Sequence, residues 1–330
     1  MPISLIVTTR NEAAALPRLL DSIAAQSRAP DEIVVVDGGS TDATLDILHA
    51  KRLPLKILSQ PGTNISAGRN AAIRAAAGDI ICSTDAGVRL DPNWLEEIVA
   101  PFFPPSSHEF LQDPGIKGTH GNSDVVSGFF LPDPCSVFET ALAATTLPAL
   151  ADIRPEKFLP SSRSIAFRKE AWARVNGYPE WLDYCEDLVF DFALRDAGYR
   201  FAFAPRAIAY FRPRENLRAF FKQYYRYARG DGKANLWLTR HLIRYATYLI
   251  ALPLAVLLTW LFPIWSLGVW LLGFLFMFFT PYKRLLPMLR NFSILDRLRA
   301  LLWVPLIRVT GDVAKMIGYP VGVWWRVTRR

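Results

Sequence analysis

Asp85 is a carboxylate in a place where an enzyme could use it, directly after the short apolar run 78–82. That run predicts a buried strand, and the small residues Ala86 and Gly87 behind the acid would let a ligand approach closely. Open α/β sheets bind their ligands at the carboxyl ends of the strands. The sequence therefore indicates a ligand site at Asp85, with a simple turn cap as the alternative.

Four other polar side chains follow strand-like runs or begin the helix after one: Thr9, Glu12, Asp37 and Arg69. If the strands are parallel, all of them lie on the same sheet edge as Asp85. Acids there could hydrogen-bond a base and a ribose, and the permanently charged Arg69 could pair with a phosphate. For the segment 37–42, whose residues also suit a turn, a helix cap is the alternative.

A pair of acids, Glu186 and Asp187, opens a predicted helix further along the chain. A carboxylate there could act as a general base that takes a proton from an acceptor hydroxyl. The alternative is capping, because negative charge is favoured at the start of a helix. Neither G-x-G-x-x-G nor G-x-x-x-x-G-K-[ST] is present, which counts against a dinucleotide dehydrogenase and a P-loop enzyme.

Strands and helices that alternate along the first part of the chain must position these side chains. Apolar runs predict strands at 3–7, 32–36, 55–58, 78–82, 124–130, 162–168 and 200–203. Helical spacing predicts helices at 13–27, 43–50, 64–77, 136–151 and 186–197. This alternation implies right-handed crossovers, so the predicted fold is α/β, with a Rossmann-like, mostly parallel sheet.

Charge divides the chain into two parts. Residues 1–205 hold 18 Lys/Arg and 26 Asp/Glu, whereas residues 206–330 hold 20 Lys/Arg and only 4 Asp/Glu. The basic part brackets apolar segments, which favours anionic lipid rather than nucleic acid as its partner. The three cysteines are widely spaced and form no CxxC motif, which is typical of reduced thiols in a cytosolic compartment.

Residues 245–282 contain no charged side chain, and prolines interrupt them. A membrane span needs about 20 residues, so this stretch predicts a helical hairpin over about 243–281 that turns near Phe262. Each flank, 206–244 and 281–330, carries 10 Lys/Arg and 2 acids. If both flanks are cytoplasmic, the number of complete spans between them is even. The tail holds shorter apolar runs, which predict basic interfacial helices, with a third span as the alternative.

Four motifs in order resemble the signatures of family-2 glycosyltransferases: Val7–Glu12 (VTTRNE), Val36–Asp42 (VDGGSTD), Ala67–Ile73 (AGRNAAI) and Thr84–Gly87 (TDAG). The resemblance covers about residues 1–235 and implies the GT-A nucleotide-sugar fold and inversion of the anomeric centre. It implies that Thr9, Glu12 and Asp37 hold the base, that Arg69 lies on the phosphate side, and that Asp85 is the first acid of the DxD element.

Two later motifs are similar to family elements as well. The pair Glu186-Asp187 resembles the family's acidic pair, which makes Asp187 the predicted catalytic base and Glu186 the second choice. Gln223, Arg226 and Tyr227 resemble the QxxRW element of membrane-bound members, with Tyr in place of Trp, and would contact the diphosphate or the acceptor sugar. An interfacial basic and aromatic helix without chemistry is the alternative for this segment.

Gly87 departs from the family pattern, because relatives usually carry a second acid there. That acid normally coordinates the divalent ion that neutralises the leaving diphosphate. The resemblance therefore implies Mg²⁺ or Mn²⁺ as cofactor, held by Asp85 together with phosphate oxygens and water. A further protein ligand is the alternative; Asp91 is the nearest acid in sequence, although a helix cap is its expected role.

The sequence as a whole predicts a GT-A domain at 1–235 and a membrane domain at 236–330. The expected function is transfer of a sugar from a nucleotide-diphospho-sugar, a UDP- or GDP-sugar, to a lipid-linked or glycan acceptor for cell-surface polysaccharide. The expected location is the inner or plasma membrane, with the catalytic domain cytoplasmic. A processive polysaccharide synthase and a catalytically silent membrane scaffold of the same fold are the alternatives.

Overall fold

The computed structural model describes residues 1–103 and 123–329 and divides the chain into two compact units. Unit 1 consists of Met1–Leu131 and Leu150–Phe211, and unit 2 of Pro132–Ala149 and Arg212–Arg330. The boundary expected from sequence lay later, after residue 235. The difference arises because the helix that carries Gln223 and Arg226 packs with the C-terminal helices.

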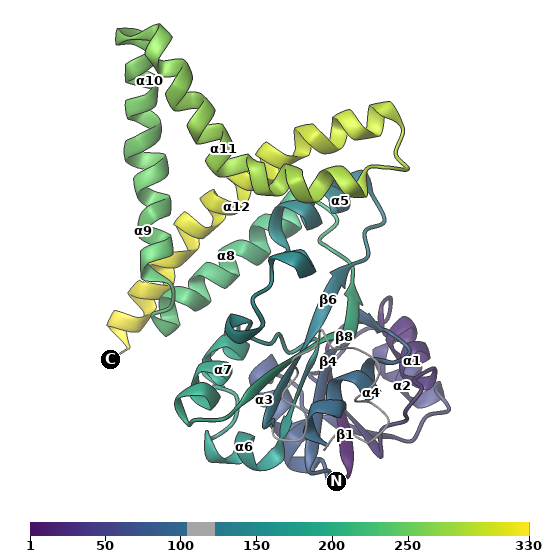
Figure 1. Ribbon diagram of the computed structural model, residues 1–330. Helices are drawn as coiled ribbons and strands as arrows, with labels where there is room; N and C mark the ends of the chain where they lie inside the picture. The colour runs from purple at the N-terminus through teal and green to yellow at the C-terminus, as the bar shows by residue number, and fades with distance from the viewer. Residues whose placement is uncertain (104–122, 330) are drawn as a thin grey trace. The chain divides into compact units, whose positions relative to one another are not determined.

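Unit 1 is built on a mixed sheet with the strand order β3-β2-β1-β4-β7-β6-β8-β5 (Figure 1). Its strands are β1 (Ile3–Thr9), β2 (Glu32–Asp37), β3 (Leu55–Ser59), β4 (Ile80–Asp85), β5 (Val88–Leu90), β6 (Val125–Pro132), β7 (Ile165–Arg168) and β8 (Phe201–Phe211). The β-α alternation predicted for the first part of the chain is confirmed: β3, β2, β1 and β4 run parallel. Beyond β4 the sheet becomes antiparallel, starting with β7, which refines the expectation of a mostly parallel sheet.

Helices and short 3₁₀ turns connect the strands of unit 1. They are α1 (Leu16–Ala24), α2 (Thr44–Ala50), α3 (Ile65–Ala75), α4 (Trp94–Val99), η1 (Ala100–Phe102), η3 (Leu150–Asp152), η4 (Pro155–Lys157), α6 (Lys169–Arg174) and α7 (Glu186–Asp196). Because side chains alternate along a strand, Leu5 and Val7 join one core cluster, whereas Ile6 joins the other. Burial of each such side chain stabilises the fold by about 1.5–3 kcal/mol.

Unit 2 is helical in the part of the chain that the structure describes. Its elements are α5 (Val137–Thr146), α8 (Leu217–Ala234), α9 (Leu238–Ala246), the π-helical turn η5 (Thr247–Ala251), α10 (Leu252–Leu261), α11 (Pro263–Met288) and α12 (Ile294–Thr328). Helix α12 packs along α8 (Figure 1). A side chain at Gly318 or Gly322 would collide with backbone atoms of α8, so glycine is what lets the two helices approach this closely.

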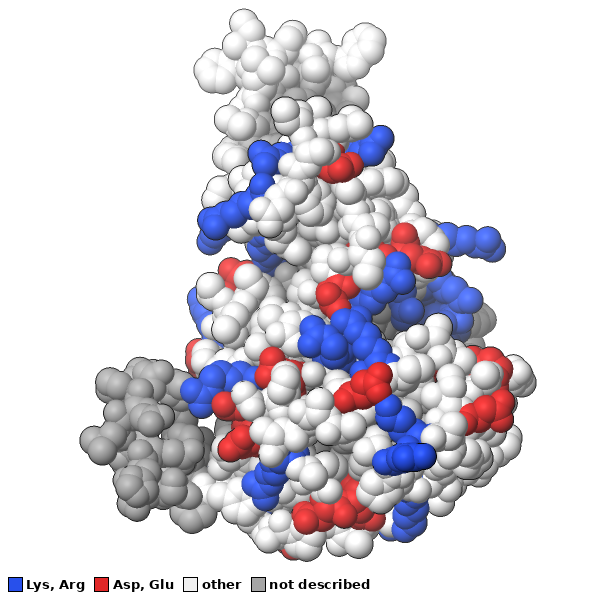
Figure 2. All heavy atoms as spheres, turned by 90° about the vertical axis from the view of Figure 1, so that its right-hand side faces the viewer, with Lys and Arg blue, Asp and Glu red and all other residues white. Residues whose placement is uncertain are grey.

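Two helices of unit 2 are long and apolar enough to cross a membrane: Leu238–Leu261, which joins α9, η5 and α10, and Pro263–Met288. They meet at Phe262, where the sequence predicted the turn of a hairpin. Their large apolar side chains are mostly exposed; Trp260, for example, is 85% exposed. Figure 2 shows the end of unit 2 formed by these helices as a surface without Lys, Arg, Asp or Glu.

The tail is one continuous helix, α12, although the sequence divided it into short apolar runs. Pro305 and Pro320 lie inside it. Each proline removes one helical hydrogen bond. Packing of α12 against α8, α5 and α11 buries Ile307 and Val304, which compensates for that loss.

Candidate functional site

Strand register brings three of the predicted site residues to one edge of the sheet. Thr9 pairs with Asp37 across β1 and β2, and Thr8 pairs with Asp85 across β1 and β4. The carboxyl ends of these parallel strands therefore meet, which is the geometry that open α/β sheets use to bind ligands. The Oγ1 atom of Thr9 is buried and has no hydrogen-bond partner among the described residues, so it can still accept or donate a bond.

Arg69 is the centre of this edge. Its Nη2 atom lies 2.9 Å from Oδ1 of Asp85, and its Nη1 atom lies 2.6 Å from Oε1 of Glu186. The side chain is only 3% exposed, and its guanidinium lies 5.4 Å from the ring centre of Tyr178. Although burial alone would lower the pKa of Arg69, the carboxylates of Asp85 and Glu186 raise it. One buried cation thus joins the end of β4 to the start of α7.

Asn70 holds the loop that leads to α7, a role that the sequence did not reveal. Its side chain is 3% exposed. Its Oδ1 atom accepts hydrogen bonds from the backbone N–H of Tyr178 at 2.9 Å and from Nε1 of Trp172 at 3.0 Å. Its Nδ2 atom donates to the Tyr178 carbonyl at 2.8 Å. Helix α3 therefore supplies both the cation at the site and the amide that anchors the loop before the acidic pair.

The two acids of the pair differ in environment. Glu186 is 7% exposed and bonded to Arg69, whereas Asp187 is partly exposed and accepts a 2.9 Å hydrogen bond from the Leu188 N–H. Burial and the neighbouring Asp187 raise the pKa of Glu186 to about 7, despite the opposing effect of Arg69. Burial likewise raises the pKa of Asp187, against Arg69. Of the two, Asp187 is the more exposed carboxylate.

Asp37 lies in a hydrogen-bonded turn of its own loop. It is fully buried, and its Oδ2 atom accepts from the N–H groups of Gly39 and Ser40, both at 3.0 Å. Its Oδ1 atom accepts from the Ser40 hydroxyl at 2.5 Å. These contacts are those of the turn that the sequence offered as the alternative. Glu12 is half-buried in the adjoining loop, where its N–H donates to Thr44 Oγ1 at 2.9 Å.

Arg163 is a charged residue of this edge that sequence reasoning missed. Its Nε atom lies 3.4 Å from Oδ2 of Asp85, and its guanidinium lies 4.6 Å from the ring centre of Phe211. Asp85 thus meets a different guanidinium on each oxygen. The segment 162–168 predicted only a strand, and nothing in a single sequence shows that the arginine near its start reaches the end of β4.

Asp85 is the candidate metal ligand of this edge. The described residues contain no group of three or more His, Cys, Asp or Glu side chains that could hold a metal ion. The Asp85 side chain is 28% exposed, and a Cβ atom added at Gly87 would meet nothing within 4 Å. The donor set fits an ion that takes Asp85 as its protein ligand and other oxygens from a diphosphate and water.

Gln223 and Arg226 belong to α8 and therefore to unit 2. The Nε2 atom of Gln223 donates to the hydroxyl of Tyr227 at 2.7 Å, one helical turn away. This bond links two members of the QxxRW-like element within a single helix face.

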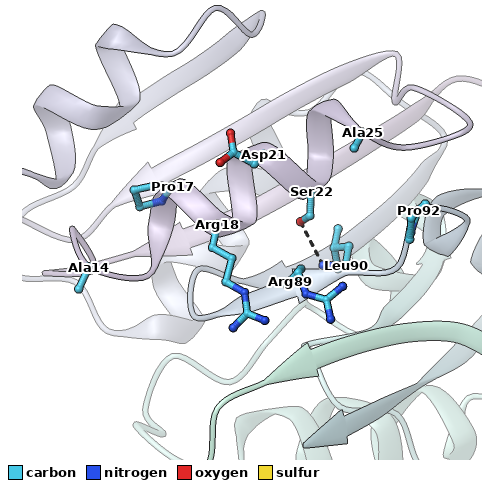
Figure 3. A pocket seen from close by; sticks show the side chains of 9 residues that line it. All are labelled: Ala14, Pro17, Arg18, Asp21, Ser22, Ala25, Arg89, Leu90 and Pro92. Carbon is cyan, nitrogen blue, oxygen red and sulfur yellow. Dashed lines mark hydrogen bonds between the residues drawn. The ribbon is translucent and has the colours of Figure 1, made fainter. Parts of the chain in front are cut away.

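A surface cleft of about 480 Å³ lies elsewhere in unit 1, between α1 and β5 (Figure 3). Arg18 and Arg89 extend toward the same side of it, and the Ser22 hydroxyl accepts a 3.0 Å hydrogen bond from the Leu90 N–H. Arg89 also stacks on Tyr210 at 4.1 Å. None of the predicted site residues lines this cleft, so its volume does not make it the catalytic site.

The raised pKa of Glu186 predicts a specific pH dependence of stability. Between pH 4.5 and about 7 the folded protein keeps a proton that the unfolded chain has lost, so stability falls as the pH rises through this window. The free energy of unfolding should fall by at most about 1.4 kcal/mol per pH unit for this one group. Urea unfolding should show Glu186→Gln gaining stability relative to the unmodified chain between about pH 5 and about pH 7. If the free energy of unfolding of Glu186→Gln and of the unmodified chain changed with pH in the same way, the raised pKa would be contradicted.

Family comparison agrees with this geometry. The model of "Glycosyl transferase family 2" matches residues 4–107, and that of "Glycosyl transferase family group 2" matches residues 80–282. The validoxylamine A glucosyltransferase of Streptomyces hygroscopicus subsp. limoneus is 34% identical over 104 residues, which is 30% of this chain and 23% of that protein. The O-antigen chain rhamnosyltransferase RfbN of Salmonella typhimurium is 25% identical over 238 residues, 67% of this chain and 71% of that protein.

A solved structure shares the fold. The mannosyltransferase PcManGT from Pyrobaculum calidifontis, in complex with GDP-Man and Mn²⁺, superimposes with a TM-score of 0.55 at 21% identity, covering 98% of this chain and 87% of that one. Together with the second family model, which spans more than half of the sequence, these matches show that the chain belongs to glycosyl transferase family 2 and is a glycosyltransferase.

Proposed function

We propose that the chain is an inverting glycosyltransferase that transfers a sugar from a nucleotide-diphospho-sugar to an acceptor held at a membrane. The observation that carries this proposal is the edge of unit 1, where the ion-paired group Asp85–Arg69–Glu186 lies beside the partly exposed Asp187. Cationic groups there suit a diphosphate, and a carboxylate beside them suits a base.

In the proposed reaction, the acceptor hydroxyl oxygen attacks the anomeric carbon as its proton passes to the carboxylate of Asp187. The bond from the anomeric carbon to the diphosphate oxygen breaks, and the nucleoside diphosphate leaves with the electron pair. The charge on the leaving group must be stabilised. Arg163 is the most accessible cation for this purpose, since its side chain is 24% exposed and Arg69 is almost fully buried.

Thr9, Glu12 and Asp37 would contact the nucleoside. The unpartnered, buried hydroxyl of Thr9 supports this role. Asp37 would act through the shape of its loop as well as through its carboxylate, because both oxygens already hold the Gly39–Ser40 turn in place. The GDP-Man complex of the similar mannosyltransferase from Pyrobaculum calidifontis supports a nucleotide-sugar donor, with the base and the sugar left open between UDP- and GDP-sugars.

The divalent ion, Mg²⁺ or Mn²⁺, would be held by Asp85 and would neutralise charge on the leaving diphosphate. The Mn²⁺ in that same mannosyltransferase complex supports this requirement. Both oxygens of Asp85 face guanidinium groups, and the longer contact, 3.4 Å to Arg163, is the one that an ion would most readily replace.

Membrane association would come from unit 2. Its two exposed apolar helices, Leu238–Leu261 and Pro263–Met288, meet the length of a span, and basic flanks favour cytoplasmic ends at an inner or plasma membrane. A membrane-held acceptor, lipid-linked or glycan, would gain effective concentration from this anchor. The O-antigen relative supports a role in polysaccharide assembly.

The proposal is tested by incubating the full chain with radiolabelled nucleotide-sugars and membranes that supply acceptors, then following label into the lipid or glycan fraction. Transfer that needs intact Asp187 is the expected result. Donor binding without transfer or hydrolysis, under every combination of donor and metal, would favour the silent scaffold. Polymer growing from a single priming event would favour the processive synthase.

Gly87→Asp should fold normally and bind Mn²⁺ more tightly, because the position is open and the added carboxylate restores the family's second acid. In the unmodified chain, the affinity for the metal should depend strongly on whether the donor is bound, and the reverse. A chelator should greatly reduce transfer. Calorimetric titration of Mn²⁺ with and without nucleoside diphosphate measures both effects. Tight Mn²⁺ binding to the nucleotide-free unmodified chain would reveal a further ligand, and full activity in excess chelator would show that the arginines suffice.

A further inference from the structure

A network of charged side chains lies at the foot of the first apolar helix, within unit 2. The carboxylate of Asp312 on α12 is 8% exposed and has a partner on each oxygen. Its Oδ1 atom lies 2.7 Å from Nε of Arg244, and its Oδ2 atom lies 3.2 Å from Nε of Arg308. The hydroxyl of Tyr248 donates to the same Oδ2 atom at 3.1 Å. One buried acid is therefore shared by two arginines and a phenol.

The second acid of the network is also committed. Asp231 on α8 lies 3.2 Å from Nε2 of His241, whose Nδ1 atom lies 3.2 Å from Nη1 of Arg244. The His241 ring stacks on Tyr319 with ring centres 3.8 Å apart. Both carboxylates therefore already have partners within the network.

Lys315 is a further cation, one helical turn after Asp312. It makes no hydrogen bond or ion pair with any residue that the structure describes, and its ammonium lies 4.7 Å from the ring centre of Tyr224 on α8. It is partly exposed, so a ligand can reach it. Burial and the nearby Arg244 lower the pKa of Lys315 to about 8, against the opposing effect of Asp312. The arrangement therefore has one more cation than it has anions to pair with.

The position of this excess charge indicates the kind of ligand. Arg244 lies near the start of the apolar helix Leu238–Leu261, where a spanning helix leaves the hydrocarbon and meets the lipid headgroups. Lys and Arg side chains near helix ends reach this headgroup level and keep their charge there. Lipid phosphates are the abundant anions there, and basic pockets between helices bind them.

We propose that Lys315, with Arg244 and Arg308 beside it and Tyr224 as one wall, binds the phosphate group of a membrane lipid. Two sources share this chemistry: an isoprenoid phosphate of the acceptor type, or a bulk phospholipid. The proposal rests on the membrane association proposed above, but not on the sugar-transfer chemistry.

The test uses the full chain in nonionic detergent and two soluble probes, farnesyl phosphate and dioctanoyl phosphatidic acid, with farnesol and dioctanoylglycerol as uncharged counterparts. Lys315→Gln should weaken binding of a phosphate probe by about tenfold, as expected for loss of a charged hydrogen-bond donor. Lys315→Arg should keep most of the affinity. Lys222→Gln, which removes an exposed lysine of α8, is the matched control and should bind as the unmodified chain does.

A purely structural role for Lys315 gives a different result. Removing an unpaired cation next to two arginines should leave the melting temperature of the lipid-free protein unchanged or higher, so the loss must appear in binding alone. Tighter binding of farnesyl phosphate would identify an acceptor-type ligand, and equal or tighter binding of phosphatidic acid a bulk phospholipid. Unchanged binding by Lys315→Gln, an equal loss in Lys222→Gln, or equal binding of the uncharged probes would overturn the site.

Flotation of the chain with vesicles separates this site from the membrane association itself. If the chain fails to float but the detergent titration shows the Lys315-dependent loss, membrane association fails and the phosphate site stands. If the chain floats and Lys315→Gln binds both phosphate probes normally, the site fails and membrane association stands.

Discussion

Asp187→Asn is expected to lower the rate of sugar transfer by about 100- to 10,000-fold, the range typical for loss of a general base. Donor affinity should stay within a few-fold, because this carboxylate would act only on the acceptor proton. The side chain is partly exposed and accepts a hydrogen bond from its own helix at the Leu188 N–H. Single-turnover kinetics, with donor binding measured separately, distinguishes the two quantities.

Glu186→Gln is the matched control for this variant. Glu186 is bonded to Arg69 and almost fully buried. A glutamine amide at this position should therefore disturb the ion pairs and the pH dependence of stability rather than proton transfer. Transfer by Glu186→Gln should therefore exceed transfer by Asp187→Asn. The reverse order, or near-normal transfer by Asp187→Asn, would reassign the base.

Arg69→Met is expected to destabilise unit 1 by about 3–5 kcal/mol, because it leaves buried carboxylates without their cation. The carboxylates of Asp85 and Glu186 lie 2.9 and 2.6 Å from the guanidinium of Arg69, and both would lose this ion-pair partner. The sequence predicted Arg69 as a phosphate ligand; in the structure its two terminal nitrogens already hold protein carboxylates. Chemical denaturation of the nucleotide-free protein, followed by a probe in unit 1, measures the loss.

Arg74→Met is the control, since Arg74 lies on the same helix but is 58% exposed and 3.9 Å from Glu180. Exposed pairs of this kind contribute at most about 1 kcal/mol, so the variant should be nearly as stable as the unmodified chain. Equal, small effects for both variants, together with a large loss of donor affinity in Arg69→Met, would restore the view of Arg69 as mainly a ligand for the donor.

The sequence allowed the parallel half of the sheet and its charged edge to be predicted, because these depend on short-range patterns. Apolar runs that end in Thr9, Asp37 and Asp85 need only parallel pairing to meet, and the register confirms that pairing. The turn at Phe262 could also be predicted, because Pro263 interrupts an uncharged stretch that is too long for a single span.

What could not be predicted depends on contacts between distant segments. Arg69 reaches Glu186 across 117 residues, and Asn70 anchors Tyr178 across 108. Which of these distant residues come into contact depends on where their side chains extend in the folded protein, and a single sequence does not reveal this. The same applies to Arg163, which lies before a strand but faces Asp85, and to Lys315, whose excess charge is visible only after the acids of unit 2 have been paired.

Calorimetric titration of the full chain with a panel of UDP- and GDP-sugars, in Mg²⁺ and in Mn²⁺, tests most directly whether this edge is a nucleotide-sugar site. We expect at least one donor to bind, Asp187→Asn to bind it within a few-fold, and Asp85→Asn to bind it at least about tenfold more weakly, since a charged contact to the metal–diphosphate group is lost. Absence of binding by every donor in both metals, or full affinity in a folded Asp85→Asn protein, would contradict the account.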